Sequence, residues 1–173
     1  EKFDEKSQLK PNSPYAASKA AAELLIRAYV KTYGLPVVVS RSVNNFGPRQ
    51  FPEKLIPFFT VRAIRNEPLP LYGTGMNMRD WLYVDDHTDA LLMLLCKGKS
   101  GDIFGISGGK EYSNKIIAQK ILSVLGKPKT LITLVKDRPA HDRKYAVDSS
   151  KLRAFGWKPK YSLENKLPDV INW

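Results

Sequence analysis

Ser13-Pro14-Tyr15-Ala16-Ala17-Ser18-Lys19 reads as the first two turns of a helix. Ser13 can cap the first free backbone amides of that helix. Pro14 suits the first helical position, because it lacks an N–H group that would have no partner there. Tyr15 and Lys19 are four residues apart and therefore share one face of the helix.

Tyr15 and Lys19 can form a chemical pair. We expect their helix to run from Pro14 to about Tyr33 and to end at Gly34. A tyrosine has a pKa near ~10 in isolation, and a neighbouring cation favours the phenolate. Tyr15 could therefore act as a base beside the Lys19 ammonium. The alternative is a tyrosine ring that packs on a lysine side chain, and the spacing alone does not decide between them.

The composition is that of one globular domain or part of a larger one, with 173 residues, 43% hydrophobic and 26% charged. No apolar run approaches the ~20 residues of a membrane span, so we expect no membrane partner. The charged start and the single cysteine, Cys96, indicate a cytoplasmic protein without a signal peptide. We expect Cys96 to be buried, and we expect no metal site.

The net charge of +11 points to a basic surface or an anionic partner. Nucleic acid is one such partner. The basic residues are scattered, however, and no run of five or more occurs. We therefore favour a basic surface or a small anionic ligand such as a nucleotide diphosphate, and we expect no nucleic acid.

Strands alternate with helices along the chain, which is typical of an α/β fold. Three consecutive valines predict a strand at 37–43 that is buried on both faces, followed by a ligand-binding loop at 44–50. We expect Asp85 or Asp86 to cap a helix that carries the apolar run 90–95. Other helices are expected at 53–65, 114–125 and after 162, and other strands at 69–72, 79–84, 102–106 and 130–135.

No glycine-rich turn of the dinucleotide-binding type follows a strand in this sequence. Gly105 and Gly108 resemble such a turn only superficially, because the next helix is expected several residues later. A base such as Tyr15 needs an electrophile or a cofactor. We therefore expect the chain to be the C-terminal half of a larger enzyme and to be inactive alone.

Five segments occur in an order that resembles the dTDP-glucose 4,6-dehydratases, a family of extended short-chain dehydrogenases/reductases. The segments are Ser13–Lys19, Asn44–Pro48, Pro52–Pro57, Arg79–His87 and Asp137–Arg143. The Tyr/Lys pair is shared by the whole superfamily, whereas the last three segments are far more specific to the dehydratases. The resemblance extends over nearly all of the chain.

This resemblance implies a Rossmann domain that holds NAD and a smaller substrate-binding domain. We expect residues 1–50 to complete the Rossmann domain and residues 51–173 to form mostly the α/β substrate-binding domain. Some segments of the latter would return to the Rossmann parallel sheet, and the N-terminal, glycine-rich cofactor half would be absent from this chain. The resemblance also implies a homodimer through the Tyr15 helix and a role in making deoxysugars such as rhamnose.

In the reaction that the resemblance implies, Tyr15 takes the proton of the sugar 4-hydroxyl while a hydride passes from C4 to NAD. Lys19 binds the nicotinamide ribose and keeps the tyrosine ionised. Water is then lost across C5–C6, and the hydride returns to C6 to give dTDP-4-keto-6-deoxyglucose. The Asp–Glu pair that the family uses for this elimination has no match in the chain, and Asp4 and Glu5 do not replace it.

The resemblance also assigns binding positions. Asn45 matches a cofactor contact and Asn44 a substrate contact. Arg79 matches the arginine that binds the diphosphate, and we expect it to meet Arg138 there. The other implied substrate contacts are Lys54, Leu55, Pro70, Leu71, Tyr72, Asn114, Asp137, Pro139, Ala140 and His141.

The sequence departs from the family at two positions and leaves two alternatives open. Phe46 stands where the family has tyrosine, and Ala140 where it has glycine. A nucleotide-sugar 4-epimerase or decarboxylase of the same superfamily would share Tyr15 and Lys19. A non-catalytic nucleotide- or nucleic-acid-binding module is the alternative from another class, and the charge of +11 favours it.

Overall fold

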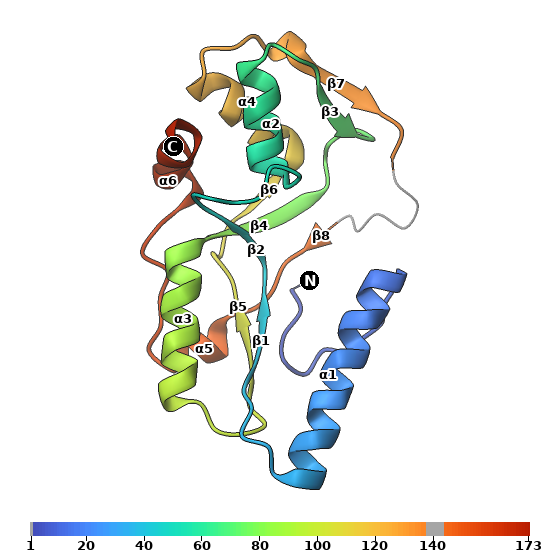
Figure 1. Ribbon diagram of the computed structural model, residues 1–173, viewed down its shortest axis with the longest axis vertical. Coiled ribbons are helices and arrows are strands. Elements are labelled where there is room, and N and C mark those ends of the chain that lie inside the picture. The colour runs from blue at the N-terminus through green and yellow to red at the C-terminus, as the bar shows by residue number, and fades with distance from the viewer. Residues whose placement is uncertain (1, 138–143) are drawn as a thin grey trace.

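The computed structural model describes residues 2–137 and 144–173, which form an elongated α/β fold with parallel strand pairs (Figure 1). No helix in these two ranges is long and apolar enough to cross a membrane. The elements in chain order are α1 (Pro14–Tyr33), β1 (Val39–Ser42), β2 (Asn44–Phe46), α2 (Leu55–Ile64), β3 (Leu69–Tyr72), β4 (Met78–Tyr83), α3 (Val84–Lys97), β5 (Ile103–Ile106), β6 (Glu111–Ser113), α4 (Asn114–Val124), a 3-10 turn (Lys129–Leu131), β7 (Ile132–Val135), β8 (Lys144–Tyr145), α5 (Ser150–Ala154) and α6 (Leu163–Asn172).

Strand β4 connects the two ends of the molecule. At one end β1 pairs in parallel with β5, and at the other β3 pairs in parallel with β7. Between them β4 pairs with β2 and β8 in parallel and with β6 in the antiparallel sense. Strand β4 therefore lies between the two ends (Figure 1), with Trp81 and Tyr83 in one hydrophobic core and Leu82 in the other.

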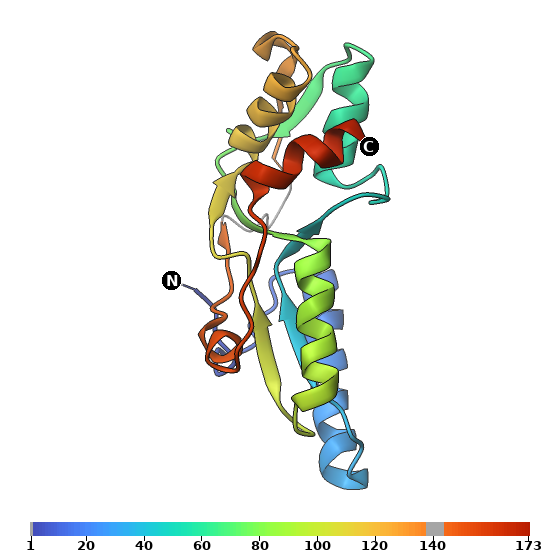
Figure 2. The ribbon, with the colours of Figure 1, turned by 90° about the vertical axis from the view of Figure 1, so that its left-hand side faces the viewer.

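Each end has its own hydrophobic core. Figure 2 shows α3 on one side of the β1–β5 pair and α5 on the other, so that both helices bury apolar side chains against these strands. The core at this end contains Val43, Leu82, Ala90, Leu94, Phe104, Ile106, Val147, Leu152 and Trp157. The second core packs α2, α4 and α6 around β3, β4 and β6, and its fully enclosed members include Phe46, Ile56, Leu69, Ile117, Ile121 and Leu122.

Helix α1 begins and ends where the sequence predicts. The Ser13 hydroxyl accepts a hydrogen bond from the amide of Ala16 at 3.2 Å, and Pro14 occupies the first turn. Gly34 ends the helix with φ of 64°, a left-handed conformation that favours glycine. No side chain of α1 is buried. The helix therefore depends on few contacts with the rest of the described chain.

Four local predictions were wrong. The stretch predicted as a loop at 44–50 begins with strand β2, because Asn44–Phe46 pairs with β4. The three valines are only half-buried, since β1 has β5 as its one described neighbour. Helix α3 begins without a side-chain cap, and Asp86 lies inside it, where its carboxylate accepts from the amides of Lys160 and Tyr161. Cys96 is exposed.

Glu164 in the first turn of α6 links that helix to β6. Its Oε1 accepts from the Tyr112 hydroxyl at 2.5 Å and from Nζ of Lys110 at 2.8 Å. Burial opposes ionisation of Glu164, but these two donors outweigh it and hold the pKa at about 2, below the ordinary 4.5. The ionised carboxylate is therefore the form that the fold stabilises.

We expect Glu164→Gln to reduce the loss of stability in acid. Because the pKa is lower in the folded state, the stabilisation is complete above pH 4.5 and is lost as the pH falls toward 2. The carboxylate is 37% exposed, so solvent screening limits the effect to at most about 1 kcal/mol. Urea unfolding on both sides of this pH window measures it. Asp169→Asn on the same helix is the control, and an equal flattening in both variants would contradict the assignment to Glu164.

Candidate functional site

The N-terminal end of α1 presents the predicted Tyr/Lys pair to solvent. Tyr15 is 73% exposed, and Nζ of Lys19 lies 5.8 Å from the centre of the Tyr15 ring. The two side chains are one helical turn apart, as their spacing predicts. The phenol and the ammonium are therefore close enough to interact and open to a ligand.

An open cavity of about 830 Å³ lies between α1, β1 and β4, within the ~300–1,000 Å³ typical of ligand sites. Tyr15 and Lys19 line it from α1, Asn44 from the start of β2 and Arg79 from β4. Tyr145 lines it too. The structure thus brings together a proton acceptor, two cations and an amide from segments far apart in the sequence.

Lys54 lies on the Tyr15 side of this region. Its pKa is raised, chiefly by the carboxylate of Glu53 at 2.6 Å and to a smaller extent by the Tyr15 phenol. The Lys54 ammonium at the start of α2 is therefore near enough to the Tyr15 phenol to interact with it electrostatically. Lys54 does not line the cavity itself, but it adds a positive charge next to it.

Asn45 points away from the cavity toward α3. Its side-chain amide nitrogen lies 3.1 Å from Nδ1 of His87, and its backbone carbonyl accepts from the Gln50 side chain at 2.9 Å. Burial lowers the pKa of His87, which favours a neutral ring whose Nδ1 can accept the hydrogen bond. His87 therefore holds the side chain that was predicted to contact the cofactor.

The other predicted contacts are spread over the opposite end of the molecule and do not line the same cavity. Leu71 in β3 is buried, and Tyr72 beside it is exposed. Asn114 begins α4, and its backbone N–H donates to the backbone carbonyl of Asn77 at 3.1 Å. The remaining positions are Leu55 at the start of α2, Pro70 in β3 and Asp137 at the edge of the described chain. Arg138, Pro139, Ala140 and His141 lie outside the described residues.

Sequence reasoning missed three residues at this site. Glu23 continues the four-residue spacing of Tyr15 and Lys19 along α1, and this spacing could have revealed it. Arg41, its partner on β1, could not be identified without the topology. His87 lies in the Arg79–His87 segment that resembles the dehydratases, but the resemblance gives it no role.

Comparison with known proteins identifies the family. The family model described as GDP-mannose 4,6 dehydratase matches residues 1–170. The chain belongs to this family. A dTDP-glucose 4,6-dehydratase of Xanthomonas campestris is 45% identical over 182 aligned residues, which cover 99% of this chain and 52% of that protein. The resemblance found in the sequence is thereby confirmed.

Solved structures agree with the fold. DesIV of Streptomyces venezuelae, a dTDP-glucose 4,6-dehydratase with NAD and TYD bound, superimposes with a TM-score of 0.97 at 42% identity. The superposition covers 100% of this chain and 54% of DesIV. The UDP-glucose 4-epimerase of Thermotoga maritima gives 0.92 at 30% identity, over 98% of this chain and 56% of the epimerase. The α/β fold of the family is therefore present, and the chain spans about half the length of the relatives that it matches.

Proposed function

We propose that this chain forms part of an NAD-dependent lyase that converts dTDP-glucose into dTDP-4-keto-6-deoxyglucose. The observation that carries the proposal is the single cavity shared by Tyr15, Lys19, Asn44 and Arg79. A phenol beside an ammonium suits removal of a hydroxyl proton, and an arginine suits a diphosphate. Relatives named dTDP-glucose 4,6-dehydratase from Xanthomonas campestris and Salmonella typhimurium, 45% and 44% identical over 99% of this chain, support this choice of substrate.

Each proposed role follows from the chemistry of the side chain. Tyr15 takes the proton of the sugar 4-hydroxyl on its phenolic oxygen, and the Lys19 ammonium stabilises the phenolate. Both side chains face the open cavity, so they fit the hydroxyl groups of a nicotinamide ribose. NAD, when bound, accepts the hydride from C4 and gives it back at C6. Asn45, fixed by His87, is the further proposed cofactor contact.

The substrate would extend from Tyr15 along β4. Asn44 and Arg79 contact it from the cavity, and Lys54 lies beside it. The other proposed contacts are Leu55, Pro70, Leu71, Tyr72, Asn114 and Asp137–His141. Among the described ones, Leu55, Pro70 and Leu71 lie outside the cavity, and Leu55 and Leu71 belong to the second hydrophobic core, which supports an extended ligand.

The test uses the full-length protein that carries this chain, with NAD and dTDP-glucose deuterated at C4. We expect a product that has lost one water and carries the deuterium at C6. A product isomeric with the substrate would instead indicate a 4-epimerase, the second candidate, which the similarity to the Thermotoga maritima enzyme favours. Mass spectrometry separates the two outcomes.

We also propose the arrangement of this part of the enzyme. Residues 1–50 belong to the cofactor domain and residues 51–173 mostly to the substrate domain. Within the latter range, β5 and α5 return to the cofactor domain, because they pack in the hydrophobic core around the β1–β5 pair. Exposed Leu24, Leu25 and Tyr29 on α1 support a homodimer through that helix. A cytoplasmic location is proposed from the sequence alone. A nucleotide sugar, and not nucleic acid, is the anionic partner that we propose for the basic chain.

Residues 1–173 alone should not bind NAD tightly. They contain no glycine-rich turn whose backbone amides could hold the pyrophosphate at a helix N-terminus. Calorimetry with these residues and NAD measures the affinity. A dissociation constant in the micromolar range would contradict the prediction.

A further inference from the structure

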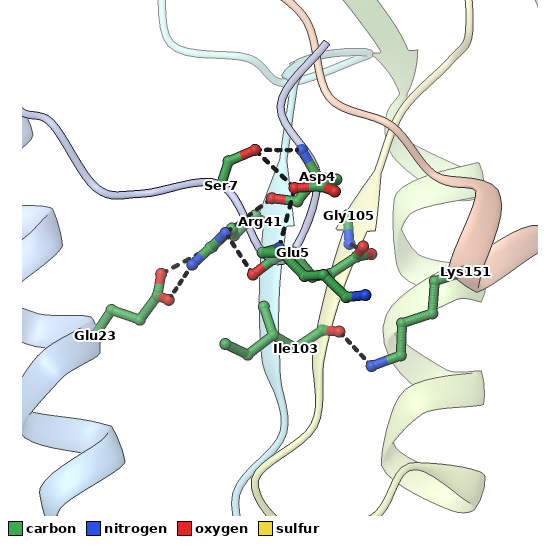
Figure 3. Close-up of polar contacts among 9 residues, drawn as sticks. Asp4, Glu5, Ser7, Glu23, Arg41, Ile103, Gly105 and Lys151 are labelled. Atoms are coloured by element: carbon green, nitrogen blue, oxygen red, sulfur yellow. Dashed lines mark hydrogen bonds and ion pairs between the residues drawn. The ribbon is translucent and has the colours of Figure 1, made fainter.

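Arg41 on β1 joins three segments of the chain (Figure 3). Its Nη2 lies 2.5 Å from Oε1 of Glu23, and its Nε donates to Oε2 at 3.1 Å, so the guanidinium and the carboxylate meet as two forks. Its Nη1 donates to the backbone carbonyls of Asp4 at 3.1 Å and Glu5 at 3.3 Å. The Arg41 and Glu23 side chains are only 19% and 17% exposed. A bidentate pair of this kind fixes an orientation as well as a distance.

The segment that receives these bonds is itself fixed to the sheet. Oε1 of Glu5 accepts from the amide of Gly105 at 2.8 Å, and Gly105 stands opposite Arg41 in the β1–β5 register. Phe3, two residues before Glu5, forms an isolated parallel β-bridge with Val147. Arg41 therefore holds α1 against a rigid support and not against a loose loop.

Helix α1 makes few other polar contacts with the described part of the chain. None of its side chains is buried. Among the described residues, Glu23 makes the only side-chain hydrogen bonds and ion pair between α1 and other elements. Within the described chain, the Arg41–Glu23 pair is therefore the direct polar link between strand β1 and the helix that carries Tyr15 and Lys19.

This pair lies next to the proposed site. Glu23 is one helical turn beyond Lys19 and two turns beyond Tyr15, while Arg41 precedes Asn44 by three residues on the strand side. All five residues line the same cavity. A shift of α1 along or around its axis would move the base relative to the side chains on β2 and β4.

We propose that Arg41 is a positioning residue, which through Glu23 sets where Tyr15 and Lys19 stand relative to the bound sugar. This inference rests on the proposed function. A displacement of ~1 Å can cost about 10²-fold in rate without removing any reacting group. Because Arg41 acts on the helix and not on the ligand, it affects turnover more than substrate affinity.

The test compares variants of the full-length protein. We expect Arg41→Gln to lower kcat by roughly 10- to 100-fold, without a comparable rise in KM. Arg41→Lys keeps the charge but not the fork, so we expect its kcat to fall less than that of Arg41→Gln. It replaces Arg41→Gln in the test if that variant does not fold. Arg62→Gln is the matched control, because Arg62 also binds a carboxylate and a backbone carbonyl, on Glu67 and Pro68, far from the cavity. Equal kcat losses in the Arg41 and Arg62 variants would overturn the inference.

The double variant Glu23→Ala/Arg41→Gln tests whether the two residues act through one link. We expect it to lose no more kcat than the worse single variant, because either change breaks the same pair. Losses that multiply would overturn the inference. Tyr15→Phe separates it from the proposed function: if Tyr15→Phe is inactive while Arg41→Gln keeps full kcat, only the positioning role fails. A Tyr15→Phe enzyme with undiminished kcat would instead refute the proposed role of Tyr15 as the base.

Discussion

Replacing Tyr15 with phenylalanine in the full-length protein should lower turnover by about 10²–10⁴-fold, the usual contribution of general acid–base catalysis. The substitution keeps the ring and removes only the hydroxyl that would accept the sugar proton. Tyr15 is exposed, so the fold loses no buried hydrogen bond. Substrate affinity should change much less than the rate, because the ring and the Lys19 ammonium remain.

The measurement is kcat at saturating dTDP-glucose, together with the dissociation constant of the substrate. Tyr33→Phe is the matched control, since Tyr33 is equally exposed at the other end of α1 and does not line the cavity. Turnover equal to that of the unaltered enzyme would remove Tyr15 from the mechanism. A loss of affinity without a loss of rate would assign it to binding alone.

The sequence predicted those elements whose boundaries are set by residues adjacent in the sequence. Helix α1 is one example, because Ser13 and Gly34 are local signals for a cap and a left-handed end. Strand β2 is the opposite case. Asn44–Phe46 is extended because Trp81–Tyr83 of β4 pairs with it, and nothing within the segment itself encodes that partner.

Asp86 shows the same limit for side chains. An aspartate near a helix start predicts a cap by local reasoning. In the structure its buried carboxylate binds the amides of Lys160 and Tyr161, which lie far along the chain. The contact fixes the segment that leads into α6. Only the folded arrangement could reveal this role.

The candidate site was predictable in part for the same reason. The helical spacing of Tyr15 and Lys19 places them together without any knowledge of the fold. Arg79 was assigned through the resemblance to a family, and its approach to Tyr15 depends on how β4 crosses the molecule. The link between Arg41 and Glu23 required both the strand order and the position of α1.

The second large expected effect is a loss of substrate affinity when Arg79 is replaced. It lines the Tyr15 cavity from β4, and its Nη1 donates to the Met78 carbonyl at 2.7 Å. An arginine next to an aspartate in the sequence could instead form a surface ion pair with it, here with Asp80. Asp80 instead is fully buried, where Ser107 donates to it at 2.8 Å and the Gly109 amide at 3.1 Å. Successive residues of a strand face opposite sides, so Arg79 is directed toward the cavity side while Asp80 enters the interior.

We therefore expect Arg79→Ala to weaken binding of dTDP-glucose by roughly 10- to 150-fold, since a charge-assisted contact is worth ~1.5–3 kcal/mol and ~1.4 kcal/mol is tenfold. Arg79→Lys should recover only part of the loss, because lysine keeps the charge but not the planar fork that matches phosphate oxygens. Calorimetry with dTDP-glucose and with dTDP measures both effects. Because the contact is to the diphosphate, the two ligands should lose affinity by similar factors.

The control is Arg65→Ala, which removes an exposed arginine at the end of α2. Loss of affinity for the sugar nucleotide alone would place Arg79 at the sugar and not at the phosphates.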